Sequence, residues 1–119
     1  MSVDEHQGEL VWVTVCRRSD IPDGRGWPVR VGELYIAVFV VGGAIRAVEN
    51  HCRHLANPID DGHVRRGCVT CPWHGWKYDL TTGEHLTAFG RKPGLRTFPA
   101  RLVGDEVQVA VESGEATSS

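Results

Sequence analysis

The apolar and β-branched residues of this sequence fall into short runs, and turn residues separate one run from the next. Short runs rich in Val, Ile and aromatic residues predict β-strands. The run at residues 34–41 is almost continuously apolar, whereas residues 106–111 alternate between apolar and polar side chains, as a strand with one buried face does. Strands are predicted at or within residues 10–16, 27–33, 34–41, 44–49, 64–70, 76–80, 97–103 and 106–111.

Glycines mark the tight turns between neighbouring strands. Gly42-Gly43 separates two strands directly and predicts a hairpin, because glycine reaches positive φ at both central positions. Gly104-Asp105 predicts a second, closing hairpin. Residues 20–26 and 85–96 contain proline and glycine and are predicted to be irregular. Since no amphipathic helix is evident and the small, polar residues 113–119 are expected to be disordered, the sequence predicts an all-β domain.

Length and charge limit the function further. At 119 residues the chain is long enough for one domain, residues 1–119, with a modest core. Its net charge is −2 and its basic residues are scattered, which argues against a nucleic-acid partner. The first nine residues lack the basic flank and apolar run of a signal peptide or membrane anchor. We therefore expect a soluble, cytoplasmic protein without membrane contact.

Two motifs carry the chemistry of the chain. Cys52-Arg53-His54 is followed by Cys71-Pro72-Trp73-His74, so that two thiolates and two imidazoles can meet once the intervening chain folds back. Such a set predicts a metal site. A tetrahedral zinc ion can use the same four ligands, Cys52, His54, Cys71 and His74.

A second pairing is open to Cys71. The spacing Cys68-x-x-Cys71 is also that of a redox dithiol or of half a zinc knuckle. That pairing would leave His74 without a role, whereas Cys68 fits an inward-facing strand position. We therefore expect Cys16 and Cys68 to be buried thiols, in a protein from a reducing compartment.

Residues 51–79 resemble the two cluster-binding boxes of the Rieske [2Fe–2S] proteins, in Cys52-Arg53-His54-Leu55 and in Cys71-Pro72-Trp73-His74-Gly75-Trp76. The resemblance implies one [2Fe–2S] cluster per chain, with Cys52 and Cys71 on one iron and His54 and His74 on the other. It also implies the Rieske fold, in which a cluster-binding subdomain, here about residues 46–85, is inserted into a small antiparallel, barrel-like base.

Some positions depart from the respiratory members of that family. Those proteins carry an extra cysteine in each box that forms a disulfide, and Asn57 and Trp73 stand in these places. They also have a serine two residues after the second histidine, where this chain has Trp76. Tyr78 occupies the place of a tyrosine that donates to a ligand sulfur, although it can equally be a core aromatic. Leu55 and Pro72 resemble the residues that shield the cluster from water.

Titratable residues outside the two boxes are expected to be ordinary surface or loop groups. Those in this class are His6, His63, His85, Asp60 and Asp61. His51 adjoins a ligand and is expected to shape the loop or its solvent edge rather than to bind metal.

The resemblance implies an electron carrier rather than an enzyme. It indicates a Rieske-type ferredoxin that receives one electron from a flavin-dependent ferredoxin reductase and passes it to the terminal oxygenase of a bacterial aromatic-ring dioxygenase system. Docking is expected at the cluster tip, around Arg53 and Leu55. One alternative within the same chemistry is the Rieske-like small subunit of nitrite reductase. An alternative from another class is a zinc-stabilised interaction module.

Overall fold

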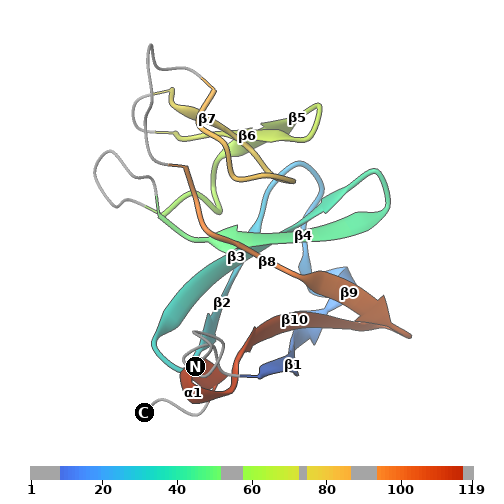
Figure 1. Ribbon diagram of the computed structural model, residues 1–119. Coiled ribbons are helices and arrows are strands. Elements are labelled where there is room, and N and C mark those ends of the chain that lie inside the picture. Colours follow the sequence, from blue (N-terminus) through green and yellow to red (C-terminus); the bar gives the residue numbers. More distant parts are fainter. Residues whose placement is uncertain (1–8, 52–57, 73–74, 87–93, 117–119) are drawn as a thin grey trace.

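The computed structural model describes residues 9–51, 58–72, 75–86 and 94–116. Within them the chain forms three antiparallel sheets, which Figure 1 shows one above another. The first sheet has the order β1 (Leu10–Arg17), β10 (Glu106–Glu112) and β9 (Ala100–Val103); the second has β2 (Trp27–Val31), β3 (Leu34–Val41), β4 (Ala44–Glu49) and β8 (Thr97–Phe98); the third has β5 (His63–Arg65), β6 (Cys68–Thr70) and β7 (Lys77–Asp79). The all-β prediction is confirmed.

The middle sheet has a core on each of its faces, which explains the apolar run of β3. Ile36 and Val38 belong to the first core, shared with β10 of the first sheet. Ala37 and Phe39 belong to the second core, shared with β6 and β7 of the third sheet. All four side chains are fully buried. A strand covered on both faces needs apolar residues at successive positions rather than at alternate ones.

The turns confirm both predicted hairpins, of which the closing one joins β9 to β10 at Gly104-Asp105, and they add a third. Gly42 and Gly43 have φ of 56° and 82° and join β3 to β4, as their sequence predicts. Where a single short strand was predicted within residues 64–70, the chain instead forms the hairpin β5–β6. Its two-residue turn, Arg66-Gly67, has φ of 54° and 78°. Positive φ at both central positions matches the twist of the flanking strands, and here an arginine accepts it at the first position.

The predicted strand at residues 97–103 is interrupted by Pro99. Before the proline, β8 pairs with β4; after it, β9 pairs with β10 of the first sheet. Proline has no N–H for a ladder, so the chain changes sheets at this residue. The Pro99 carbonyl still accepts the backbone N–H of Ala110 at 2.9 Å.

The prediction of a disordered tail from Ser113 onward is wrong for its first four residues. A short helix, α1 (Ser113–Ala116), follows β10 directly. The two terminal guanidinium nitrogens of Arg96 each donate to the Glu115 carboxylate at 2.8 Å, and the Ser113 N–H donates to the Glu9 carbonyl at 2.8 Å. Composition alone does not reveal these contacts with distant segments. No helix in the described ranges is long and apolar enough to cross a membrane.

The third sheet is connected to the rest of the molecule through neighbouring strands. The chain leaves the middle sheet at the end of β4 and returns to it in β8, which pairs with β4 at Ala47 and Val48. The first two sheets form a base, and the third sheet is an insertion between β4 and β8 of that base (Figure 1).

Candidate metal centre

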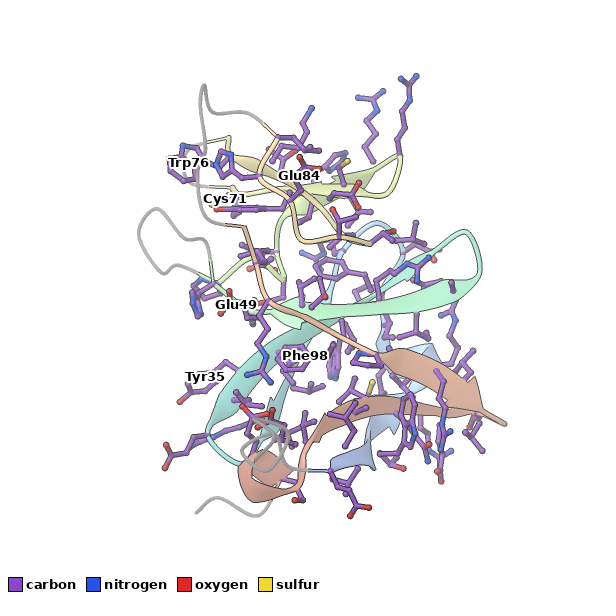
Figure 2. The ribbon with its side chains drawn as sticks, in the orientation of Figure 1. Tyr35, Glu49, Cys71, Trp76, Glu84 and Phe98 are labelled. Atoms are coloured by element: carbon purple, nitrogen blue, oxygen red, sulfur yellow. The ribbon has the colours of Figure 1, made fainter. Side chains whose placement is uncertain are left out.

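Cys71 directly follows β6, where the loop to β7 begins. Its N–H donates to the Trp76 carbonyl at 2.6 Å, and its carbonyl accepts the Gly75 N–H at 3.1 Å. Gly75 closes this loop with a φ of 72°, which glycine adopts without strain. Figure 2 shows Cys71 and Trp76 together beside the third sheet.

The Cys71 side chain belongs to the second core. It is 1% exposed and shares this core with Ile59, Val69 and Tyr78. A buried thiol with apolar neighbours suits a ligand of an iron–sulfur group, because such a wall keeps water from the metal–sulfur bonds. The described part of the second box therefore fits the predicted cluster.

Three predicted ligands, Cys52, His54 and His74, lie outside the described residues, and so do Arg53, Leu55, Asn57 and Trp73. Within the described ranges no group of three or more His, Cys, Asp or Glu side chains is arranged to hold a metal ion. The four-ligand set remains a prediction.

The structure does describe both ends of the segment that contains the first box. At the near end, the Asn50 N–H donates to the Tyr35 carbonyl at 2.9 Å. At the far end, the Asn50 side-chain oxygen accepts the N–H groups of Ile59 and Asp60 at 2.9 and 3.0 Å. The Asn50 amide nitrogen also donates to the Asp60 carboxylate at 3.0 Å. Hydrogen bonds of the Asn50 side chain thus hold together the two ends of the segment that contains the first box.

The return of the first-box segment packs against the strand that leads into the second box. Ile59 and Cys71 lie in the same core. Gly62 approaches β6 so closely that a Cβ at this position would overlap the Thr70 carbonyl oxygen and the Val69 side chain. The fold therefore brings the chain next to the first box and the chain next to the second box to the same end of the molecule.

Cys68 does not face inward, so that prediction is wrong. Val69, between Cys68 and Thr70, is the fully buried residue of β6, and Cys68 lies half-buried on the outer face with its thiol directed to the Arg66 carbonyl at 3.9 Å. Side chains alternate along a strand, so burial of Val69 turns Cys68 outward. This placement argues against a Cys68–Cys71 dithiol, because Cys71 lies in the second core.

Cys16 is half-buried at the edge of the first core rather than fully buried. Desolvation, with a smaller contribution from the Asp20 carboxylate, raises the pKa of its thiol to about 11. The group is therefore a protonated, unreactive thiol at neutral pH.

The histidines outside the two boxes are not all surface residues, contrary to the prediction. His63 is exposed, as predicted. His85 is not a plain surface residue: its ring packs edge-on against the rings of Trp76 and Tyr78, with centroids 4.3 and 5.0 Å away. The His51 Nε2 lies 3.3 Å from the Glu49 carboxylate, at the edge of the first-box segment. Tyr78 itself is fully buried in the second core.

The two aspartates also differ from each other. Asp60 is bound by Asn50 and helps to organise the site, which sequence analysis missed because it treated the aspartate as a solvated loop residue. Asp61 is exposed and pairs with Arg25 at 3.6 Å.

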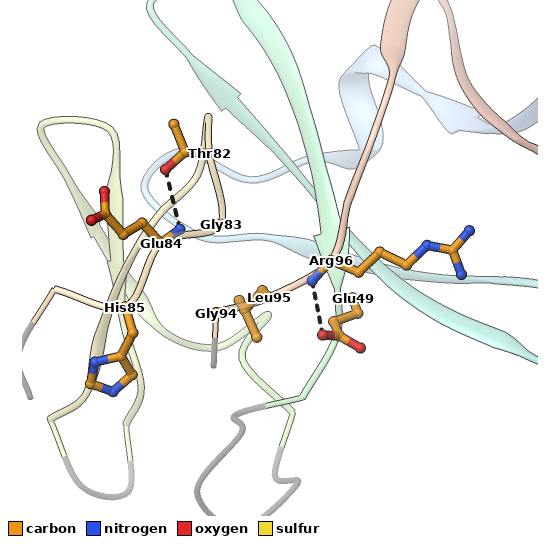
Figure 3. Close-up of a pocket in the computed structure, with 8 residues that line it drawn as sticks. All are labelled: Glu49, Thr82, Gly83, Glu84, His85, Gly94, Leu95 and Arg96. Carbon is orange, nitrogen blue, oxygen red and sulfur yellow. Dashed lines mark hydrogen bonds between the residues drawn. The ribbon is translucent and has the colours of Figure 1, made fainter. Parts of the chain in front are cut away.

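A cleft of about 640 Å³ lies where the third sheet meets the base. Figure 3 shows Gly83, Leu95, Arg96 and Glu49 around it, with the Arg96 N–H donating to the Glu49 carboxylate at 2.9 Å. A backbone hydrogen bond joins two segments that line the cleft: the Leu95 N–H donates to the Gly83 carbonyl at 2.7 Å. This contact fixes the turn after β7 against the segment that leads into β8.

Comparison with known proteins decides the family. The Rieske [2Fe-2S] domain matches residues 11–99, which is most of the chain. The chain belongs to the Rieske [2Fe–2S] family. The ferredoxin component of naphthalene 1,2-dioxygenase/salicylate 5-hydroxylase systems from Ralstonia sp is 31% identical over 101 residues, covering 85% of this chain and 96% of the relative.

Two solved structures show the same Rieske fold. The complex of reduced oxygenase and oxidized ferredoxin in carbazole 1,9a-dioxygenase contains a chain that matches with a TM-score of 0.74 and 32% identity, over 86% of this chain and 94% of that one. A putative NADH-dependent nitrite reductase small subunit from Mycobacterium tuberculosis matches with a TM-score of 0.78 and 25% identity, over 88% and 98%. The predicted Rieske fold is confirmed, and the cofactor that the family implies is a [2Fe–2S] cluster.

Proposed function

We propose that this Rieske protein is a soluble cytoplasmic ferredoxin that carries one electron from a flavin-dependent reductase to the terminal oxygenase of an aromatic-ring dioxygenase system. The observation that carries the proposal is the likeness, over almost the full length of the relative, to a dioxygenase ferredoxin component. That relative is named as a ferredoxin component of an oxygenase system, and we assign this chain the same role as a carrier without turnover of its own.

We propose that Cys52 and Cys71 bind one iron and that His54 and His74 bind the other. A cluster held in this way accepts and releases a single electron. The buried position of Cys71 supports its part in the proposal, since the second core excludes water from the thiolate side. Asn50 supports the assignment of the first-box ligands, Cys52 and His54, because its hydrogen bonds fix both ends of the segment that contains them.

We propose that the electron leaves through the imidazole ligands, His54 and His74, of the two boxes. Contact with each partner is transient, so the interface should be small, at or below about 1,200 Å² of total buried surface. A large apolar interface would hold the carrier on one partner and prevent it from reaching the other.

The test is reconstitution with the proteins encoded beside this chain. If these include a flavin-dependent reductase and an oxygenase, the purified components should oxidise NADH and consume oxygen with an aromatic substrate only when this protein is present. Omitting the protein, or replacing it by the His54→Ala variant, is the control. Turnover at the same rate without the carrier would disprove the proposal.

A second candidate is supported by the nitrite reductase small subunit, whose fold matches with a TM-score of 0.78. The same reconstitution separates the two functions. Nitrite-dependent NADH oxidation that requires this chain would assign it to the reductase, and oxygen consumption would assign it to the dioxygenase. The zinc-module alternative is not retained, because the family is a [2Fe–2S] family.

A further inference from the structure

The outer face of the third sheet is basic, although the whole chain carries a net charge of −2. His63 and Arg65 are the exposed positions of β5, on either side of the half-buried Val64. Lys77 is the exposed position of β7, beside the fully buried Tyr78. Alternation along the strands therefore places these basic side chains on the side opposite the second core.

Strand register gathers these side chains in two rows. One row is formed by His63, Thr70 and Lys77, which pair across β5, β6 and β7. The second row contains Arg65 and Cys68. Together with Arg66 from the hairpin turn, the residues of the two rows line an open cleft of about 430 Å³. We call this surface the basic face; its residues are His63, Arg65, Arg66, Cys68, Thr70 and Lys77.

The carboxylates near the basic face do not neutralise its arginines. Asp79 continues the second row, but its carboxylate accepts the N–H groups of Thr81 and Thr82 at 2.7 and 3.1 Å, which directs it to its own turn. Within the described ranges no carboxylate forms an ion pair with Arg65 or Arg66. Both side chains are exposed and available to an approaching anion.

The basic face borders the second cluster-binding box. Thr70 precedes Cys71 directly, and Lys77 follows Trp76, whose carbonyl accepts the Cys71 N–H. A protein docked on the row of His63, Thr70 and Lys77 would therefore sit next to the chain that holds a proposed iron ligand. Electron transfer requires this closeness, whereas a basic patch on the far side of the base would not provide it.

We propose that the basic face is a docking surface for a redox partner whose contacting surface is acidic. The inference rests on the proposed carrier function and names the chemistry of one of its partners. Charge complementarity raises the rate of encounter and orients the partner without adding the apolar area that would slow its release. Arg65 and Arg66 attract the acidic surface, and the row of His63, Thr70 and Lys77 brings the partner next to the second box, which contains the proposed ligands Cys71 and His74.

The experiment uses two c-type cytochromes of similar potential, one acidic and one basic, as oxidants of the reduced protein. Oxidation is followed by stopped-flow absorbance at low ionic strength, where charges act over about 30 Å. The variant Arg65→Gln/Arg66→Gln removes two charges from the basic face. The control Arg17→Gln/Arg101→Gln removes two charges from exposed residues of the first sheet, at the other end of the molecule (Figure 1).

We expect the rate constant for oxidation by the acidic cytochrome to fall by a factor of about three or more in the Arg65→Gln/Arg66→Gln variant. The rate with the basic cytochrome should not fall in this way, and neither should the rate of the control variant with the acidic cytochrome. The midpoint potentials of all three proteins should agree, which excludes a change in driving force. The proposal is overturned if the two variants slow the acidic cytochrome equally, since overall charge would then suffice, or if neither variant slows it. The assay needs neither reductase nor oxygenase, so it fails independently of the proposed function.

Discussion

Asn50 and Asp60 are joined by two hydrogen bonds: the Asn50 side-chain oxygen accepts the Asp60 N–H at 3.0 Å, and the Asn50 amide nitrogen donates to the Asp60 carboxylate at 3.0 Å. The two residues lie on either side of the first cluster-binding box. Because the same oxygen also accepts the Ile59 N–H, the side-chain oxygen of Asn50 serves two backbone donors. The chain around the first box is thereby closed by a single side chain.

We expect Asn50→Ala to destabilise the protein by about 1–3 kcal/mol, because it leaves two partly buried backbone N–H groups without their acceptor. Urea unfolding, followed by the visible absorbance of the cluster, measures this loss. Asn50→Asp keeps the acceptor but replaces the amide donor by a carboxylate that faces the Asp60 carboxylate, so it should be destabilised as well. The control is Glu33→Ala at an exposed turn of the base, for which a change within about 0.5 kcal/mol is expected.

His54→Ala and Cys71→Ala should each yield a colourless protein whose cluster end is poorly folded, because metal binding and folding of the two boxes are coupled. Iron and sulfide analysis of the purified variants checks this result. Cys68→Ser is the matched control: Cys68 lies on the outer face of β6, so the variant should keep a full cluster. A full cluster in either ligand variant would refute the ligand assignment.

Gly83→Ala should destabilise the protein more than Gly104→Ala. Both glycines have positive φ, 79° and 63°, so both variants bear the backbone strain of about 1 kcal/mol. Only at Gly83 does the new methyl group overlap another backbone atom, the Leu95 carbonyl oxygen, whereas nothing lies within 4 Å at Gly104. Thermal unfolding of the two variants compares them directly, and equal losses would show that the loops separate easily.

The Arg96–Glu115 pair should make a small, pH-dependent contribution to stability. The hydrogen bonds from Arg96 lower the pKa of Glu115, so the contribution is present above the unfolded-state pKa, about 4.3, and is lost as pH falls through the lower folded-state pKa. The pair is partly exposed, so Glu115→Gln should cost about 0.5–1 kcal/mol at pH 7. Chemical unfolding at pH 7 and pH 3 should show a smaller difference from the unmodified protein at the lower pH, and the exposed Glu84→Gln serves as the control.

The reduction potential should lie in the lower part of the Rieske range, at about −150 to 0 mV, with little pH dependence near neutrality. The chain lacks the disulfide cysteines, with Asn57 and Trp73 in their places, and has Trp76 where respiratory relatives have serine. Protein-film voltammetry measures the midpoint. A value above about +100 mV, or a steep fall between pH 6 and 8, would contradict the dioxygenase-type assignment.

A second voltammetric measurement tests Trp76 directly. Trp76→Ser should raise the potential by about 40 mV if the new hydroxyl donates one hydrogen bond, of about 1 kcal/mol, to a cluster sulfur. Trp76 also packs edge-on against His85, so loss of packing has to be separated from gain of a donor. Trp76→Phe, which removes packing surface and the indole N–H without adding a hydroxyl, provides this control, and the potential of Trp76→Ser should be the higher of the two.

The sequence predicted the features of the fold that arise locally. The hairpin at Gly42-Gly43 follows from two adjacent residues that favour positive φ, and β3 follows from its own apolar run. The β5–β6 hairpin was missed because Arg66 carries the positive φ, and arginine gives no turn signal. The helix after β10 was missed because Glu115 is held by Arg96, nineteen residues earlier in the chain.

The candidate site divides in the same way. The two boxes could be found from the spacing of cysteine and histidine, and the buried position of Cys71 agrees with them. The role of Asn50 could not be found, because its partners are placed by the fold rather than by a motif. Cys68 was assigned to the wrong face because a shift of one residue reverses every side chain of a strand, and packing of Val69 decides the choice.

The pairing of β4 with β8 at Ala47–Phe98 and Val48–Thr97 makes the metal-bearing part of the chain a cassette. Its two ends emerge from adjacent strands, so a short turn between them would close the base into a continuous hairpin. The Glu49 N–H already donates to the Arg96 carbonyl across this gap at 2.8 Å. Exchange of the whole cassette between relatives would therefore require two junctions only, and we expect the potential and the choice of partner to follow the cassette while the base stays the same.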